Sequence, residues 1–195
     1  MALCTFFGAG NYTAPMKRKK PPQDHTVEAP ESVTMKVIGH VRSPYKERFG
    51  TPRQPTVTEQ VLEDRPLDAT IELLPGQNFE QAVQDLSAFE YIWVVCWLHL
   101  NEGWKPTVIP PRGPKVRRGL FATRSPHRPN PIGLSALRLT KVEGRVLHVH
   151  GLDLIDGTPV LDIKPYIPFA DAFPDAKPGW LDEINQAPDA PDRYE

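Results

Sequence analysis

The residues with the most chemical potential lie close together between Arg124 and Gly133, where two arginines, one histidine and three prolines occur. The segment reads Arg124-Ser125-Pro126-His127-Arg128-Pro129-Asn130-Pro131-Ile132-Gly133. Prolines restrict the backbone, so a loop that already holds guanidinium groups loses little entropy when it orders around an anion. Arginine can also hold a carboxylate or a phosphate with two parallel hydrogen bonds. The sequence therefore predicts an anion-binding loop, although a proline-rich turn with incidental charge would also fit.

A second set of candidate residues lies on one predicted strand near the C-terminal end. Side chains alternate along a strand, so Asp162, Lys164 and Tyr166 share one face, while Leu161 and Ile163 share the other. A carboxylate, an amine and a phenol on one face could transfer a proton, and Asp162 and Tyr166 are the candidate catalytic residues. Asp162 and Lys164 could equally form an ordinary surface ion pair.

Two histidines, His148 and His150, also share one face of a predicted strand. Zinc would need a third and a fourth ligand, and no residue nearby has the spacing of one. The sequence has no C-x-x-C or H-E-x-x-H pair, no Walker loop and no G-x-G-x-x-G after a strand. We therefore expect no metal site, no P-loop chemistry and no dinucleotide bound on a Rossmann sheet. The histidines are expected to form a polar strand face or to line a ligand.

Charge is unevenly distributed along the chain, although the net value is −1. Residues 103–142 contain nine cations and no Asp or Glu, whereas residues 153–195 contain ten acidic residues and three cations. A basic run can be only a solvated surface, but one of this length predicts contact with an anion or a nucleic acid. The first candidates for contact with RNA phosphates are Arg117, Arg118 and Arg128. The nine cations are Lys105, Arg112, Lys115, Arg117, Arg118, Arg124, Arg128, Arg138 and Lys141.

A chain of 195 residues must position these side chains, and it is long enough to bury a core without disulfides or metal. Its 23 prolines exclude an all-α fold. Its longest apolar run, residues 92–98, is far too short to span a membrane as a helix. The two cysteines, Cys4 and Cys96, lie far apart, which predicts no disulfide framework and a reducing, cytoplasmic compartment.

Alternating and β-branched segments predict eight short strands and one short helix. The helix is expected over 78–89, where Phe79, Ala82, Val83 and Leu86 share a face and Asn78 could cap the first turn. This order lacks the alternation of a βαβ fold and predicts a mostly β protein, a small, mainly antiparallel β-barrel with a proline-rich C-terminal loop. We expect a disordered extension over 1–34, the barrel domain over 35–175 and a tail over 176–195. The strands are expected at residues 36–42, 57–63, 70–74, 91–98, 116–122, 134–142, 146–151 and 160–164.

Several motifs, in the same order along the chain, resemble the TsaA/TrmO-type family of methyltransferases. They lie at residues 38–46 (IGHVRSPYK), 52–55 (PRQP), 119–125 (GLFATRS), 128–133 (RPNPIG) and 152–166 (LDLIDGTPVLDIKPY). The resemblance covers residues 35–175 and implies an S-adenosylmethionine-dependent enzyme that is built on a β-barrel and acts as a homodimer. Members of the family methylate N6 of threonylcarbamoyladenosine at position 37 of tRNA, beside the anticodon. Longer members add a second C-terminal domain, which would affect how the tRNA is held.

The same resemblance implies a cofactor site that is made of four segments. An arginine could hold the carboxylate of the cofactor, and the adenine could lie between a loop and an apolar strand end. Two other functions stay open at this point, namely a non-catalytic barrel that binds RNA and methyl transfer to a small molecule or a protein. The implied cofactor residues are Pro52, Arg53 and Gln54, then His99 and Leu100, then Arg124 and Leu134, and finally His150, Gly151, Leu152 and Asp153.

Overall fold

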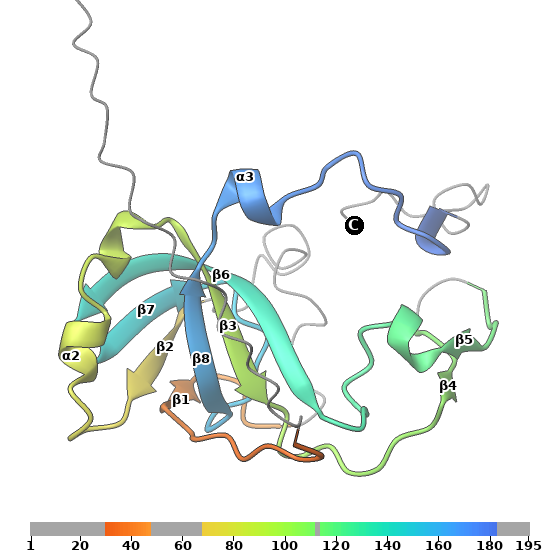
Figure 1. The fold of residues 1–195 in the computed structure, drawn as a ribbon, viewed down its shortest axis with the longest axis horizontal. Coiled ribbons are helices and arrows are strands. Elements are labelled where there is room, and N and C mark those ends of the chain that lie inside the picture. Colours follow the sequence, from red (N-terminus) through yellow and green to blue (C-terminus); the bar gives the residue numbers. More distant parts are fainter. Residues whose placement is uncertain (1–29, 48–67, 112–113, 183–195) are drawn as a thin grey trace, which may run out of the picture. The chain divides into compact units, whose positions relative to one another are not determined.

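The computed structural model describes residues 30–47, 68–111 and 114–182, and the chain divides by its internal contacts between Thr34 and Met35. Antiparallel strands form a closed barrel in the order β1-β2-β7-β6-β3-β8 (Figure 1). The predicted antiparallel barrel is confirmed, while the strand predicted over 57–63 lies outside the described residues. The barrel strands are β1 (Gly39–Arg42), β2 (Asp68–Leu73), β3 (Tyr91–Trp97), β6 (Ile132–Glu143), β7 (Val146–His150) and β8 (Pro159–Pro165).

Alternating apolar side chains fill the inside of the barrel. Ile71 on β2, Val94 on β3, Leu137 on β6 and Leu147 on β7 are completely buried. Removing each of them from water stabilises the fold by about 1.5–3 kcal/mol. The connection after β7 adds Leu152 to the same core, so this segment is fixed by packing as well as by its ends.

Two irregularities in the strand pairing change which side chains face the core. Between β3 and β8 the register shifts so that Cys96 pairs with Val160 and Val95 pairs with Asp162. Leu161 is the extra residue of this bulge. The prediction that Leu161 and Ile163 share one face is therefore wrong, because Val160 is buried in the core and Ile163, not Leu161, packs against the same core.

The helix predicted over 78–89 is present as two short pieces, α2 (Phe79–Ala82) and the 3-10 helix η2 (Leu86–Ala88). Asp85 has a positive φ of 64° between them, and this left-handed residue interrupts the helix. Asn78 stands at the N-cap position, but its side chain caps no backbone N–H. The residues of the predicted apolar face that pack against the core are Phe79, Val83 and Leu86.

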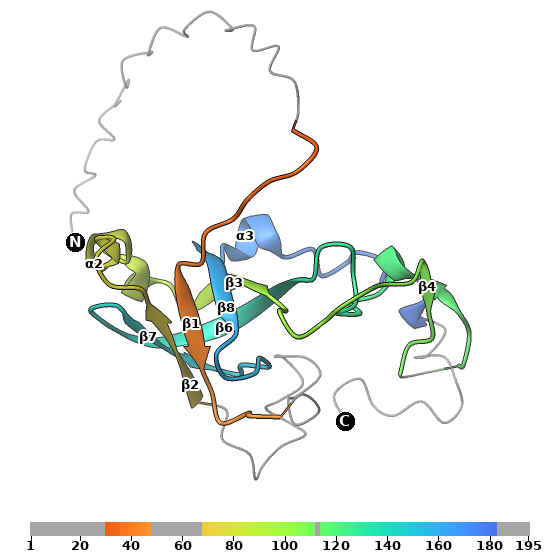
Figure 2. The same ribbon diagram turned by 90° about the horizontal axis from the view of Figure 1, so that it is seen from below.

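Between β3 and β6 the chain leaves the barrel and forms a separate two-stranded sheet of β4 (Thr107–Val108) and β5 (Arg118–Gly119) (Figures 1 and 2). The strand predicted over 116–122 is wrong in its second half, where the 3-10 helix η3 (Leu120–Ala122) follows β5. The backbone amide and the hydroxyl of Thr123 both donate to the carbonyl of Leu120, at 3.1 and 2.8 Å, and turn the chain there.

The proline-rich C-terminal segment contains α3 (Pro168–Asp171). The Oδ2 atom of Asp171 accepts hydrogen bonds from the backbone amide of Ile167 at 2.8 Å and from the indole of Trp93 at 3.1 Å. The first bond stays at the start of α3, and the second joins α3 to β3. No helix in the described part of the chain is long and apolar enough to cross a membrane.

Candidate active site

One rim of the barrel carries most of the residues that the sequence assigns to the cofactor. Because neighbouring strands are antiparallel, the C-terminal ends of β1, β3 and β7 meet the N-terminal ends of β2, β6 and β8 at this rim. We call it the site rim. Segments that are far apart in the sequence therefore come together there. Pro52, Arg53 and Gln54 lie outside the described residues, on the connection between the rim ends of β1 and β2.

The turn after β3 and the start of β6 form one side of the site rim. The amide of Leu98 donates to the carbonyl of Pro131 at 2.7 Å, which fixes the turn that carries His99 and Leu100 beside the start of β6. Leu134 is 59% exposed and Leu100 is 43% exposed. These two leucines give the rim an apolar surface of the kind on which an adenine ring can lie.

The segment after β7 forms the other side of the site rim. His150 ends the strand, and its Nδ1 lies 2.9 Å from a carboxylate oxygen of Asp68 on β2. Gly151 follows with φ at 80°, a left-handed conformation that turns the chain at little cost only for glycine. The side chain of Leu152 is completely buried, so this residue can meet a ligand only through its backbone.

Asp153 supplies a carboxyl group to the site rim, and the pKa of this group is shifted by its surroundings. Burial raises the pKa of its carboxyl group, and the hydroxyl of Ser135, which donates to Oδ1 at 2.9 Å, and the charge of Arg124 partly offset that effect. A carboxylate that burial penalises gains from a cation beside it. The charge of Arg124 thus acts on the Asp153 carboxyl, although the two residues are 29 positions apart in the sequence.

Cys96, near the rim end of β3, is completely buried. Burial, and then the charge of Asp153, raise the pKa of the Cys96 thiol to about 12, so the thiol stays protonated and unreactive. Gly133 pairs with Cys96 across β6 and β3. A Cβ atom at Gly133 would lie 2.5 Å from the Cys96 Sγ, so only glycine lets the two strands approach here. The sequence showed no sign of this close approach.

The loop between Arg124 and Gly133 differs from the prediction in the role of one arginine. The Nη1 atom of Arg128 donates to the carbonyl of Thr123 at 2.9 Å, with longer bonds of 3.4 and 3.5 Å to the carbonyls of Leu120 and Ser125. Arg128 thus holds the loop in shape, whereas the side chain of Arg124 is exposed. The loop is ordered by its own arginine as well as by its prolines.

The other two arginines that were predicted to contact RNA lie beside β5. Arg117 is exposed, and Arg118 places its guanidinium carbon 5.1 Å from the ring centre of Trp180. That distance allows a cation–π interaction. RNA contact by these arginines stays a prediction.

The two candidate catalytic residues on and after β8 do not lie together at the site rim. The carboxylate of Asp162 accepts a hydrogen bond from the amide of Ile163 at 2.9 Å and pairs with Lys164 at 2.6 Å. Tyr166 packs against Tyr91 and Trp93, near the start of β3. The length of β3, about 20 Å at 3.3 Å per residue, separates that end from the site rim. The geometry therefore favours the surface ion pair over a proton-transfer set.

The two histidines of β7 each pair with a carboxylate. His148 Nε2 lies 2.8 Å from Glu143, while His150 pairs with Asp68. In the ranges that the structure describes, no group of three His, Cys, Asp or Glu side chains could hold a metal ion. The expected polar strand face is therefore present at these positions.

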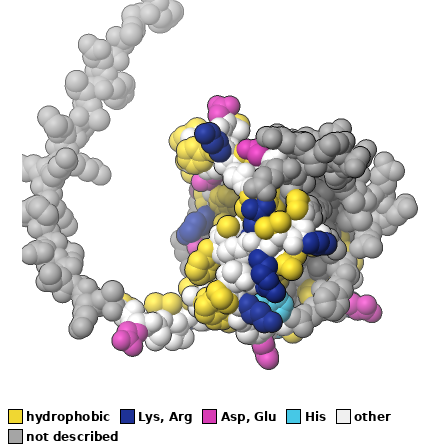
Figure 3. All heavy atoms as spheres, turned by 90° about the vertical axis from the view of Figure 1, so that its right-hand side faces the viewer, with side chains coloured by type: hydrophobic (Ala, Val, Ile, Leu, Met, Phe, Trp, Pro, Cys, Tyr) yellow, Lys and Arg dark blue, Asp and Glu magenta, His cyan; other side chains and the backbone are white. Residues whose placement is uncertain are grey.

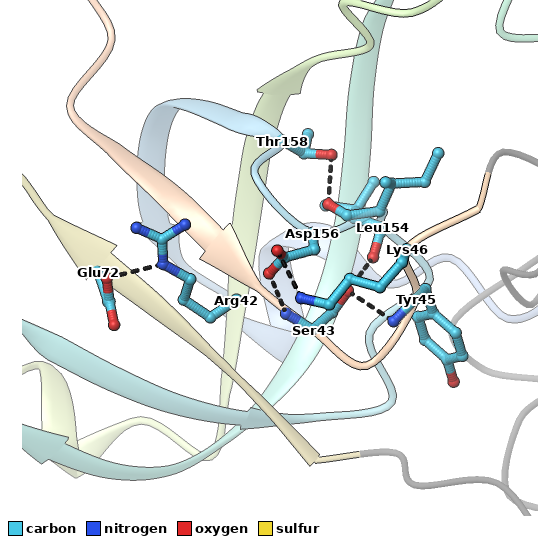
Figure 4. A network of polar contacts seen from close by, with 9 residues as sticks. Arg42, Ser43, Tyr45, Lys46, Glu72, Leu154, Asp156 and Thr158 are labelled. Atoms are coloured by element: carbon cyan, nitrogen blue, oxygen red, sulfur yellow. Dashed lines mark hydrogen bonds and ion pairs between the residues drawn. The ribbon is translucent and has the colours of Figure 1, made fainter.

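A network at the end of β1 was not predicted from the sequence (Figure 4). Asp156 accepts a hydrogen bond from the amide of Ser43 at 3.0 Å and pairs with Lys46 at 2.6 Å, while the hydroxyl of Ser43 donates to the carbonyl of Leu154 at 2.9 Å. The ion pair with Lys46 is the main reason why the pKa of Asp156 is lowered. The sequence identified both turns but gave no sign that they bind each other.

The same network borders a cavity of about 760 Å³ on the outer side of β1, β2 and β7. Its lining includes Lys46, which follows β1, and Asp68, which is the first residue of β2. The connection that contains Pro52, Arg53 and Gln54 therefore begins and ends at this cavity.

The chain is similar to known proteins in sequence and in structure. The family model of the tRNA-methyltransferase O N-terminal domain matches residues 40–172. A tRNA (adenine(37)-N6)-methyltransferase of Escherichia coli (strain K12) is 46% identical over 146 residues, which cover 71% of this chain and 60% of that protein. A probable S-adenosyl-L-methionine-binding protein of Archaeoglobus fulgidus is 40% identical over 153 residues, which cover 78% of this chain and 39% of that protein.

The crystal structure of TrmO from Pseudomonas aeruginosa has a TM-score of 0.62 and 38% identity, and the match covers 77% of this chain and 63% of that one. The chain thus spans less than two thirds of the length of these relatives.

Proposed function

The chain belongs to the tRNA-methyltransferase O N-terminal domain family, and on that premise we propose that it is an S-adenosylmethionine-dependent methyltransferase. Its proposed substrate is N6 of threonylcarbamoyladenosine at position 37 of tRNA, reached through the anticodon stem-loop. We further propose that it acts as a homodimer in the cytoplasm, where its substrate would lie, and without a metal ion. The observation that carries the proposal is that the site rim gathers the residues implied for the cofactor, with Leu98 bonded to Pro131 at 2.7 Å and Ser135 bonded to Asp153 at 2.9 Å.

The residues of the site rim fit the cofactor in charge and in polarity. The exposed guanidinium of Arg124 suits a carboxylate, and the buried carboxyl of Asp153 would gain from an ammonium group. Leu100 and Leu134 offer apolar surface for the adenine. When bound, the cofactor supplies a methyl group on a sulfonium, which is already a good leaving group.

The chain itself then has to bind, orient and exclude water rather than provide a nucleophile. The acceptor nitrogen must approach in line with the methyl carbon, and correct orientation contributes much of the rate in such a reaction. The carbamoyl group makes the N6–H of this substrate more acidic than that of a plain amine, which lessens the need for a strong base. The turn at Gly151 and the hydrogen bond from Arg128 to Thr123 hold the backbone in shape on the two sides of the proposed site. They support a role in orienting the substrates.

Mass spectrometry of tRNA nucleosides tests the proposal in cells. A strain without the gene should lack N6-methylated threonylcarbamoyladenosine and accumulate the unmethylated nucleoside, and a plasmid copy should restore the methyl group. A copy with Arg124→Ala should restore much less. Unchanged nucleosides in the deletion strain would contradict the proposed substrate and favour a non-catalytic RNA-binding barrel or another methyl acceptor.

A further inference from the structure

Phe121 is the most exposed aromatic side chain of the segment between β3 and β6, at 77% exposure. Its neighbour Leu120 is only 2% exposed, because the η3 turn directs the two side chains to opposite sides. Single exposed aromatic rings are common on protein surfaces, so exposure alone does not indicate a partner. The surroundings of the Phe121 ring set it apart from the other exposed rings.

The ring of Phe121 is held in place by a cation that is itself fixed. The guanidinium carbon of Arg128 lies 5.3 Å from the ring centre, within the range of a cation–π interaction. The same guanidinium donates to the carbonyl of Thr123 at 2.9 Å, so it is not free to swing away. One side of the ring thus meets a positive charge, while most of the ring surface stays open.

A second pair of the same kind lies next to the first. The indole of Trp180 donates to the carbonyl of Ala122 at 2.8 Å, and Arg118 lies over its ring. We call these four residues, Phe121, Arg128, Trp180 and Arg118, the aromatic surface. Figure 3, which views the side where β4 and β5 lie in Figure 1, shows Lys and Arg side chains among hydrophobic ones across its centre.

We propose that Phe121 stacks on an unpaired base of the RNA that neighbours the methylated nucleotide; this inference rests on the proposed function. Aromatic rings beside cations in a positively charged groove are the features that bind single-stranded RNA without reading its sequence. The sequence from 103 to 128, which contains Phe121, carries seven cations and no carboxylate, which favours a polyanion over a protein or a second copy of this chain. Phe121 is also three residues from Arg124, which is at most about 10 Å along the chain. The aromatic surface therefore lies beside the proposed cofactor site.

Fluorescence anisotropy with a labelled tRNA anticodon stem-loop tests the stacking role. Phe121→Ala and Phe121→Leu should both weaken RNA binding about tenfold, because leucine keeps the apolar volume but not the ring. Phe121→Tyr should bind within twofold of the wild type. Phe169→Ala, which removes the 92% exposed phenylalanine of α3, is the matched control and should leave the affinity unchanged.

Three further measurements make the result specific. The salt dependence of RNA binding should keep its slope in all Phe121 variants, since no charge is removed. Affinity for S-adenosylmethionine, measured by calorimetry, should also stay unchanged. Sedimentation at matched concentrations should show the same oligomeric state for wild type and Phe121→Ala.

Each other outcome overturns the inference. Equal RNA affinity of wild type and Phe121→Ala, or full binding by Phe121→Leu, would remove the stacking role and leave the proposed function intact. A change of oligomeric state in Phe121→Ala would assign the ring to a contact between copies of the chain. A wild-type protein that binds the cofactor but no RNA would contradict both the inference and the proposed tRNA substrate.

Discussion

At the level of single residues, the site rim contains a carboxyl group, that of Asp153, whose pKa is raised by burial. Asp153 is partly buried, and its ionised form is supported by the hydroxyl of Ser135, by its own backbone amide and by the charge of Arg124. Such a group responds strongly to an additional charge, because little water is present to screen the interaction. Binding of a cationic ligand and ionisation of Asp153 should therefore be coupled.

Replacing Arg124 by alanine should weaken the binding of S-adenosylmethionine more than tenfold. The loss of a bidentate partner for a carboxylate removes about 1.5–3 kcal/mol. Calorimetry on the purified variant measures the change, and Arg138→Ala, which removes an exposed arginine paired with Glu90, serves as the matched control. An unchanged affinity in a folded Arg124→Ala variant would remove Arg124 from the cofactor site.

The affinity for S-adenosylmethionine should rise as the pH rises through the pKa of Asp153. Burial raises that pKa above the ordinary value of 3.8, so at low pH the free protein holds a neutral carboxyl group that cannot pair with the ammonium of the cofactor. Ionisation at higher pH creates the pair, after which the affinity should level off. Asp153→Asn should bind more weakly and show a flat profile over the same range. A wild-type profile that is also flat would show that Asp153 does not meet the ammonium.

At the scale of secondary-structure elements, close contact between strands and two bulges shape the rim. Gly133 lets β6 approach β3 at Cys96, and the bulge at Leu161 changes which side chains of β8 face the core. A second shift lies between β6 and β7, where Thr140 is the extra residue and its hydroxyl donates to the carbonyl of His148. Such bulges increase local twist and help a short sheet to close.

Gly133→Ala should lower the free energy of unfolding by about 1–3 kcal/mol, because the new methyl group would overlap the sulfur of Cys96. The double variant Gly133→Ala/Cys96→Ala should recover part of this loss, since the overlap is gone. Gly119→Ala, where nothing lies within 4 Å of the added Cβ, is the control and should change stability little. Urea unfolding measures the wild type, these three variants and the single variant Cys96→Ala. Additive losses in the double variant would show that the sulfur is not the obstacle.

The strands could be predicted from the sequence because one face of each is buried, as the alternation from Leu137 to Leu139 illustrates. The bulge at Leu161 could not, because one extra residue changes the facing of a strand without changing its composition. The bonds between Ser43 and Asp156 were also out of reach, because they join turns 113 residues apart. The grouping at the site rim came from the family resemblance, and the spacing of the residues alone did not indicate it.

At the level of the whole molecule, the distribution of charge along the chain indicates which parts are candidates for contact with a tRNA. The basic residues of 103–142 flank the proposed cofactor site through Arg124, while the acidic residues concentrate after 153. The family model matches residues 40–172, so the chain contains the matched domain within its length. Under the proposed function, the basic segment between β3 and β6 is the first candidate for contacts with RNA.

Replacing Arg117 and Arg118 together by glutamine should flatten the dependence of RNA affinity on salt. Each contact with a phosphate of single-stranded RNA contributes a slope of about −0.7 in log affinity against log salt, so two lost contacts should change the slope by about 1–1.5. Cofactor affinity should stay the same. Binding of a stem-loop RNA at several salt concentrations gives the two slopes. Parallel lines would place the phosphate contacts elsewhere, first at Arg124.

Methyl transfer by the purified chain is the most direct test of the proposed function. The protein is incubated with S-adenosylmethionine that carries a deuterated methyl group and with tRNA that does or does not carry threonylcarbamoyladenosine at position 37, and the nucleosides are then analysed by mass spectrometry. We expect that only threonylcarbamoyladenosine gains the labelled methyl group, and that Arg124→Ala greatly reduces the gain. No labelled nucleoside from a folded protein that binds both cofactor and tRNA, or label on another nucleoside, would contradict it.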